Sequence, residues 1–257
     1  MCPYLFKGTP YEISSWAFSL IVGFIITVTL ALIKRPKDFP VGRWQMFVAA
    51  LFMACFGLIG SKLLFILLHW QFFIEKGYTS FRMIGYVSGR AFLGALIFEL
   101  LAIFAFTKLR IRRKSFLKAG DYAISFIMLH QAFVRIGCFF TGCCYGRPTD
   151  LPWGCKFVAT SPTVSRHPTQ IYSALILVLT FIITRHIYKK NQPTGITFYS
   201  GLCMYGFFRF FVEILRTDSI QVFGAITLAQ LAMLSLFAIG ALAILIILLL
   251  QKYYRNA

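Results

Sequence analysis

Four polar side chains recur at helical spacing in the aromatic segment "YGFFRFFVEILRTD", residues 205–218. They are Tyr205, Arg209, Glu213 and Arg216, separated by four, four and three positions, so an α-helix places them on one face. Charged side chains inside an apolar span tend to mark a substrate path, and guanidinium groups bind phosphate through paired hydrogen bonds. Two interpretations stay open: a salt bridge that holds a helical bundle together, or two arginines flanking a carboxylate to bind an anionic headgroup. We favour the second.

A second polar segment, "RIGCFFTGCCYGRPT", ends another apolar run at residues 135–149. On a helix, Arg135 shares a face with Gln131 and Cys138. Its planar guanidinium suits a phosphate group. The alternative is that Arg135 only extends toward the outer lipid headgroups, which the glycine-rich sequence after it makes the weaker interpretation.

Cysteines are concentrated in the same region, at Cys138, Cys143, Cys144 and Cys155. Adjacent cysteines seldom both reach one tetrahedral ion without a local turn, so we predict no metal site, and no cofactor is expected. A disulfide from Cys155 to Cys143 or Cys144, small apolar packing and a reactive thiol remain as alternatives.

The remaining ionisable side chains in apolar runs are less informative. His130 lies about 140° around the helix from Arg135, which favours a histidine packed inside the bundle. His167 opens the next apolar run, where it can cap a helix, bind a headgroup or be exposed. Glu99 is a candidate partner for Lys62.

Composition indicates the kind of protein that must position these residues. Of the 257 residues, 59% are hydrophobic and only 13% are charged, which is typical of a multi-span membrane protein. The net charge of +18 does not indicate nucleic-acid binding, because the basic residues form short clusters between apolar runs. Lipid headgroups are the expected anionic partner.

We predict an all-α membrane protein: a seven-transmembrane helical bundle that forms one domain over residues 1–257. Each span needs about 20 apolar residues. The candidate spans are residues 14–33, 44–69, 91–107, 122–140, 170–187, 196–215 and 228–250.

Basic residues in the loops predict the orientation of this bundle. Fifteen lie after the first, third, fifth and seventh spans, whereas seven lie in the N-terminus and the other loops. The positive-inside rule therefore predicts an N-terminus outside and a C-terminus in the cytoplasm. No basic segment with a small-residue cleavage site precedes the first span, so we expect a retained anchor.

Three segments in order, "RIGCFFTGCCYGRPT", "HPTQIYSA" and "GFFRFFVEILRTD", resemble the bacterial prolipoprotein diacylglyceryl transferases. The resemblance implies an enzyme of the bacterial cytoplasmic (inner) membrane. Such an enzyme transfers the diacylglyceryl group of phosphatidylglycerol to the lipobox cysteine of a preprolipoprotein and releases glycerol phosphate. A divergent paralogue that binds anionic phospholipid with a different acceptor, or without catalysis, is the alternative.

The resemblance also implies roles for individual residues. The catalytic residues it implies are Arg135, Arg209 and Glu213. The substrate-binding residues it implies are Arg135, Cys138, Cys143, Tyr145, Gly146, His167, Gln170, Tyr172, Tyr205, Arg209 and Arg216.

This sequence departs from the family pattern at several positions, among them Lys62, where the family tends to have an arginine. Cys138, Thr141 and Cys143 stand where the family usually has two asparagines and a glutamate, and Leu93 stands at a family histidine. Leucine cannot transfer a proton. The candidate bases that remain are His130, Tyr145 and a cysteine thiolate, unless the substrate thiol ionises unaided.

Overall fold

A computed structural model of the chain describes residues 3–8, 12–75, 94, 97, 98, 101, 113–157, 164–190, 192–216, 221–223 and 226–256. The chain divides into two compact units, Met1–Lys34 with Leu117–Ala257, and Arg35–Phe116. The larger unit holds every residue of the two polar segments described above.

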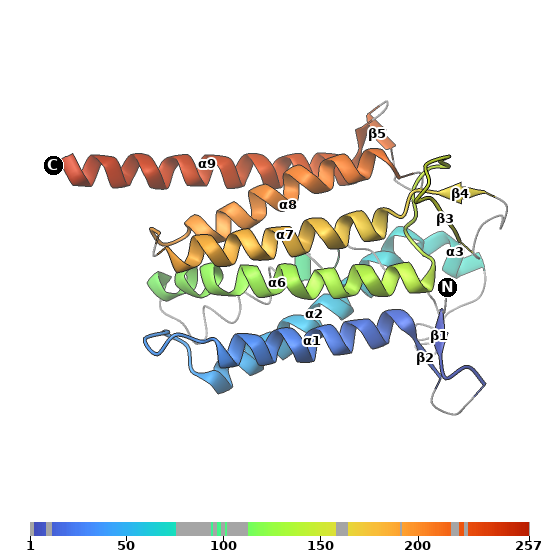
Figure 1. The fold of residues 1–257 in the computed structure, drawn as a ribbon, viewed down its shortest axis with the longest axis horizontal. Helices are drawn as coiled ribbons and strands as arrows, with labels where there is room; N and C mark the ends of the chain where they lie inside the picture. The colour runs from blue at the N-terminus through green and yellow to red at the C-terminus, as the bar shows by residue number, and fades with distance from the viewer. Residues whose placement is uncertain are drawn as a thin grey trace. The chain divides into compact units, whose positions relative to one another are not determined.

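Five long helices build the larger unit (Figure 1). They are α1 (Ser15–Ile33), α6 (Arg113–Thr141), α7 (Thr169–Lys189), α8 (Ile196–Ile214) and α9 (Leu228–Asn256). Its strands are short antiparallel pairs: β1 (Tyr4–Leu5) with β2 (Ile13–Ser14), β3 (Cys155–Lys156) with β4 (Ser165–Arg166), and β5 (Gln221–Phe223) with β6 (Ile226–Thr227).

Contacts along α1 and α6 show that these helices run in opposite directions. The Tyr122 hydroxyl, early in α6, donates to the carbonyl oxygen of Ala31 near the end of α1 at 2.6 Å. Near the end of α6, Gly137 lies so close to the start of α1 that a Cβ atom there would be 2.8 Å from Ser19 Cβ. The end of α6 therefore lies beside the start of α1.

Helix α8 runs in the same direction as α6. The carboxylate of Asp121, early in α6, accepts hydrogen bonds from the backbone N–H groups of Gly195 (2.6 Å) and Phe198 (2.8 Å) at the start of α8. Helix α7 connects the end of α6 to the start of α8 and runs in the opposite direction. The C-terminal ends of α6 and α8 and the N-terminal end of α7 consequently meet at one end of this unit, beside β3 and β4 (Figure 1).

The helices pack through small residues and an apolar core. Ile124, Met128 and Leu177 are buried between α6 and α7. A Cβ atom on Gly206 of α8 would lie 2.6 Å from the Met233 carbonyl oxygen of α9. Such close backbone approach is typical of helix pairs in membranes, where lipid tails are as apolar as leucine and packing drives association.

The smaller unit contains α2 (Arg43–Leu68) and α3 (Trp70–Glu75). Its backbone approaches itself closely at Gly60 and Gly94, where a Cβ atom on either residue would collide with the carbonyl oxygen of the other. Only glycine fits such a contact without a shift of the backbone.

Within the described residues, five helices are long and apolar enough to cross a membrane: α1, α2, α6 from Leu117, α7 and α9 up to Arg255. They correspond to the predicted spans 14–33, 44–69, 122–140, 170–187 and 228–250. The predicted span 196–215 is helix α8, which is not among the five because charged, hydroxyl and glycine residues lower its hydropathy. Most of the predicted span 91–107 lies outside the described residues.

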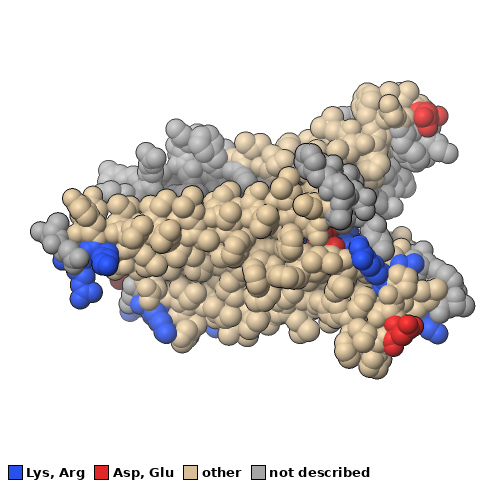
Figure 2. Space-filling model, turned by 90° about the horizontal axis from the view of Figure 1, so that it is seen from above, with Lys and Arg blue, Asp and Glu red and all other residues tan. Residues whose placement is uncertain are grey.

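Large apolar side chains cover the outside of these helices, including Leu242, Leu245 and Leu249 of α9. Tan, uncharged atoms make up most of the face shown in Figure 2. An apolar surface of this extent is unstable in water and stable in lipid. The protein is therefore a helical membrane protein with several spans.

Candidate functional site

The end of α6 is closed by a turn that brings Cys143 back to Cys138. The Gly142 N–H donates to the Phe139 carbonyl oxygen at 3.1 Å, and the Cys143 N–H donates to the Cys138 carbonyl oxygen at 3.2 Å. This pair of bonds is the Schellman motif, which needs a left-handed residue after the helix. Gly142 supplies it with φ +77°.

Cys144, two residues after Gly142, also has a left-handed backbone, with φ +63°. Few residues other than glycine adopt this conformation. The start of α7 holds the turn in place: the Gln170 amide donates to the Cys143 carbonyl oxygen at 2.5 Å, and the Thr169 hydroxyl donates to the Cys144 carbonyl oxygen at 2.6 Å. As a result, the Sγ atoms of Cys138, Cys143 and Cys144 all lie within 4.8 Å of one another.

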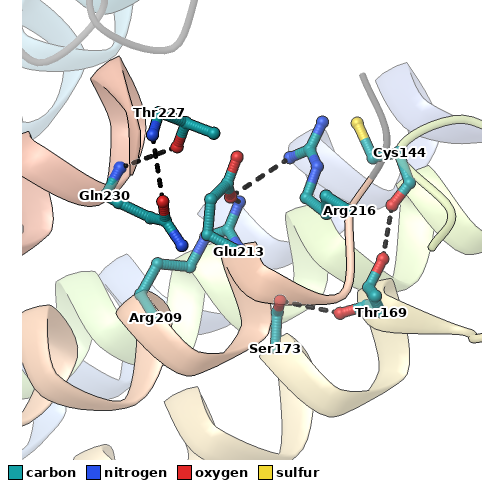
Figure 3. A network of polar contacts seen from close by, with 8 residues as sticks. All are labelled: Cys144, Thr169, Ser173, Arg209, Glu213, Arg216, Thr227 and Gln230. Carbon is teal, nitrogen blue, oxygen red and sulfur yellow. Dashed lines mark hydrogen bonds and ion pairs between the residues drawn. The ribbon is translucent and has the colours of Figure 1, made fainter. Parts of the chain in front are cut away.

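The polar face of α8 carries a buried ion pair (Figure 3). Arg209 Nη2 lies 2.7 Å from Glu213 Oε2, and Arg216 Nη1 lies 3.9 Å from the same oxygen. Arg209 is 8% exposed and Glu213 is 4% exposed. Among the described residues, Arg209 Nη1 and Arg216 Nε are buried without a hydrogen-bond partner. Buried donors of this kind are costly unless something pairs with them, so they indicate room for an acceptor.

Arg135 of α6 joins this face of α8. Its guanidinium lies against the Tyr205 hydroxyl and the thiols of Cys138 and Cys144. It also lies within electrostatic reach of Arg209. The two polar segments that the sequence singled out therefore form one site, at the end of the unit where α6 and α8 end.

The charged groups in this site change the pKa values of the thiols that follow α6. The pKa of Cys144 lies well below its ordinary value, because the Cys138 and Cys143 thiols hydrogen-bond to it and the guanidiniums of Arg216 and Arg135 stabilise its thiolate. The pKa of Cys143 is raised, because hydrogen bonds with the Cys138 and Cys144 thiols favour its protonated form and its position is partly buried. Of these two thiols after α6, Cys144 therefore loses its proton more readily.

The loop after α6 forms the border of the site. Gly146 pairs with Arg216 in an isolated β-bridge, and its N–H donates to the His167 carbonyl oxygen at 2.9 Å. A Cβ atom on Gly146 would lie 2.8 Å from both His167 Cβ and the Leu215 carbonyl oxygen, so no larger residue fits there without a shift. This contact holds the loop against the end of α8.

Three predicted site residues lie in the loops around the site and in the first turn of α7. The Tyr172 hydroxyl accepts from Trp153 Nε1 at 2.8 Å and lies 3.2 Å from His167 Nδ1. The Tyr145 ring packs on Phe157, with ring centroids 5.3 Å apart. His167 and Tyr145 thus belong to the surrounding loops and Tyr172 to the start of α7. The arginines gather where α6 and α8 end.

Other expectations from the sequence have different outcomes. The disulfide from Cys155 to Cys143 or Cys144 is wrong, because all three are free thiols and the Cys155 Sγ lies 3.6 Å from the Trp153 carbonyl oxygen. His130 packs edge-on against Phe24 of α1, as a bundle histidine would. Glu99 and Leu93 lie outside the described residues.

Sequence reasoning did not assign Cys144, Thr169 or Arg166 to the site. Arg166 lies over the Tyr145 ring, 5.2 Å from its centroid, and its Nη1 donates to the Gly146 carbonyl oxygen at 3.4 Å. A glycine directly after an apolar helical run is a signal for the turn that pairs Cys138 with Cys143. No comparable local signal marks Thr169 or Arg166, because their partners are distant in sequence.

Comparison with known proteins identifies the family that this chain matches. The family model described as Prolipoprotein diacylglyceryl transferase matches residues 3–247. Three similar proteins are all named Phosphatidylglycerol--prolipoprotein diacylglyceryl transferase. The one from Clostridium tetani is 32% identical over 85% of this chain and 86% of its own length. Those from Coxiella burnetii (31% identical, 94% of each chain) and Pasteurella multocida (30%, 95% of this chain and 91% of the relative) are matched over nearly their full length.

Proposed function

The chain belongs to the prolipoprotein diacylglyceryl transferase family, and on this premise we propose that it transfers the diacylglyceryl group of phosphatidylglycerol to the cysteine thiol of a prolipoprotein. The names of its relatives give both substrates. The relatives cover 85–95% of the chain at about 30% identity, which supports the same activity. It is a transferase of lipoprotein biosynthesis.

The observation that carries this proposal is the meeting of Arg135 and Arg209 beside Tyr205. Two guanidiniums from different helices repel one another in a site of low dielectric constant, and an anion between them removes that repulsion. Glu213 occupies one nitrogen of Arg209, and Arg209 Nη1 has no partner among the described residues. A lipid phosphate that accepts from Arg135 and from this free nitrogen would satisfy both.

The roles proposed for Arg135 and Arg209 match the place where negative charge develops in the reaction. The substrate sulfur forms a bond to the glyceryl carbon of phosphatidylglycerol, while the bond from that carbon to the phosphate oxygen breaks. The electron pair of the broken bond leaves with glycerol phosphate, which becomes a phosphate monoester. The proton of the thiol goes to a base or to this phosphate, whose second pKa is about 6. Arg135 and Arg209 lower the barrier by stabilising the negative charge on the leaving phosphate.

The depth of the site agrees with a phospholipid donor. Arg135 precedes the end of α6 at Thr141 by six residues, and Arg209 precedes the end of α8 at Ile214 by five. At 1.5 Å per residue, both Cα atoms lie roughly 7–9 Å inside the helix ends. This is a depth at which a lipid headgroup and its phosphate can reach the arginines from the bilayer.

We also propose seven spans in one domain of the bacterial inner membrane, with the N-terminus outside and the C-terminus in the cytoplasm. The alternating directions of α1, α6, α7, α8 and α9 support an odd number of crossings. The end of α7 opposite the site carries Lys189 and Lys190. Basic residues at that end support its assignment to the cytoplasm and the assignment of the site to the outer side.

An assay with labelled phosphatidylglycerol and a lipobox peptide tests the function. Arg135→Ala and Arg209→Ala should each lower the rate of thioether formation about 10²–10³-fold, the effect of removing one donor from a developing anion. Arg255→Ala, at an exposed position in the last turn of α9, is the matched control and should keep the native rate. Intact lipid and no thioether product with the native protein would refute the transfer.

A measurement of lipid binding distinguishes a transferase from a paralogue that binds phospholipid without catalysis. Native protein that binds phosphatidylglycerol in detergent but never consumes it, with binding lost in Arg209→Ala, would identify a phospholipid-binding paralogue. Native rates in both arginine variants would instead show that the phosphate binds elsewhere.

A further inference from the structure

We propose that the thiols of Cys138, Cys143 and Cys144 form a binding site for one cuprous ion, Cu⁺. Their Sγ atoms lie within 4.8 Å of one another, at the junction of α6 with the loop that follows it. This inference does not depend on the transferase activity, because it follows from the positions and charges of the thiols.

The spacing of the three sulfurs is close to what a thiolate-bound ion needs. Metal–sulfur bonds to d¹⁰ ions are about 2.3 Å long, which places three bound sulfurs roughly 4 Å apart. The sulfurs here have to approach by less than an ångström. The local turn that adjacent cysteines require for a shared ion is present, because Cys144 has φ +63°.

The site is also held in place before any ion binds. The Schellman turn fixes Cys143 relative to Cys138. Thr169 and Gln170, which are 2% and 1% exposed, fix the carbonyl groups of Cys144 and Cys143 through short hydrogen bonds from α7. A residue held in a left-handed conformation by such contacts is a feature typical of functional sites.

The number and charge of the ligands favour Cu⁺ over Zn²⁺. Thiolates select soft ions such as Cu⁺ and Zn²⁺. Zinc sites are almost always four-coordinate, whereas the cluster of described metal-binding side chains holds three sulfurs and no fourth histidine, cysteine or carboxylate. A cuprous ion is satisfied by three thiolates, and the resulting complex carries two negative charges. Arg135 and Arg216, which both lie near Cys144, supply two positive charges.

Binding involves no change of oxidation state. Three Cu–S bonds form, the protons that the three sulfurs still hold are released to solvent, and the copper enters and remains as Cu⁺. Because Arg135 faces both the cluster and the proposed phosphate position, the loaded cluster should compete with phospholipid for this arginine. Copper would then inhibit the transferase, although copper binding itself can be measured without activity.

The test uses the full chain purified in detergent and kept reduced with a phosphine, with a coloured Cu⁺ chelator as competitor. The native protein should remove one Cu⁺ per chain from the chelator. Cys143→Ser and Cys144→Ser should each bind Cu⁺ about 100-fold more weakly or worse, since loss of even an outer partner of a metal ligand typically lowers affinity 10–100-fold. Cys155→Ser is the matched control, because Cys155 lies in the same loop region outside the cluster, and it should bind as the native protein does.

A second measurement requires no variant and so does not depend on the folding of the serine substitutions. X-ray absorption of the copper-loaded native protein should show three sulfur neighbours, and loading should protect Cys143 and Cys144, but not Cys155, from alkylation. Native affinity in both cluster variants, fewer than three sulfur neighbours, or tight binding of Zn²⁺ without Cu⁺ would each overturn the proposal.

Discussion

Glu213 shows how one residue can serve both stability and chemistry. Its carboxylate lies between two arginines at 4% exposure, 2.7 Å from Arg209 and 3.9 Å from Arg216. Desolvation of such a group is expensive, and removal of one partner leaves an uncompensated buried charge. In the proposed reaction the same carboxylate also directs Arg209, whose Nη1 would then donate to the phosphate. Stability and transfer must therefore be measured separately.

Single and double substitutions of this ion pair should separate the two roles. Arg209→Met and Glu213→Met should each lower the free energy of unfolding by about 3–5 kcal/mol, because each removes the nearest partner of a buried charge. The double variant should regain most of that stability and still lack transfer activity. Thermal unfolding in detergent and the thioether assay measure the two quantities. A double variant as active as the native protein would show that the pair is only structural.

Helix α8 is capped at its N-terminus by a side chain from another helix. It begins after Gly195, which has φ +100°, and no side chain of its own caps its N-terminus. The Asp121 carboxylate of α6 accepts from two of the unpaired N–H groups instead. A helix N-terminus left uncapped in a bundle is unfavourable, and a negative group there also interacts favourably with the positive end of the helix dipole. Asp121 therefore sets the position of α8 along α6, and with it the height of Arg209 relative to Arg135.

Loss of this cap should destabilise the bundle. We expect Asp121→Ala to lower the free energy of unfolding by about 1–3 kcal/mol, and Asp121→Asn, which keeps an acceptor oxygen, by less. Thermal unfolding in detergent measures the effect, and Asp38→Ala at an exposed position is the control. Equal stability of Asp121→Ala and Asp38→Ala would contradict the role given to Asp121.

At the scale of the whole molecule, the described helices of the larger unit place the candidate site at one end of that unit. Helices α6 and α8 end there and α7 begins there, together with the loop that carries Gly146 and His167. The glycines that allow close approach of α8 and α9, such as Gly206, lie along the helices and serve packing. The proposed orientation puts the site on the outer side of the membrane, where an exported prolipoprotein arrives.

Labelling with a membrane-impermeant maleimide checks that orientation. In intact spheroplasts Cys155, beside the site, should react, whereas a cysteine introduced by Arg255→Cys in the last turn of α9 should react only after lysis. Peptide mass spectrometry identifies the labelled positions. Reaction of the α9 cysteine in intact spheroplasts would place the C-terminus outside and reverse the proposed topology.

Much of the fold was predictable from the sequence, because the signals are local. Apolar runs of helical length predicted six helices of the structure to within a few residues, apart from the longer ends of α6 and α9. The spacing of Arg209, Glu213 and Arg216 predicted their shared face, since residues three and four apart on a helix are always neighbours. The glycine after α6 likewise had a local meaning as a helix stop.

Local sequence signals could not predict how the three thiols are arranged or that Arg135 lies close to Arg209. Where Cys144 directs its thiol depends on a left-handed backbone that cysteine rarely adopts, and that backbone is held by Thr169 and Gln170 from a later helix. The disulfide inferred for Cys155 failed for the same reason, because cysteine spacing along the chain does not reveal which side chains converge. Local geometry is set by the order of residues, whereas contacts between helices depend on the packing of the whole bundle and appear only in the folded structure.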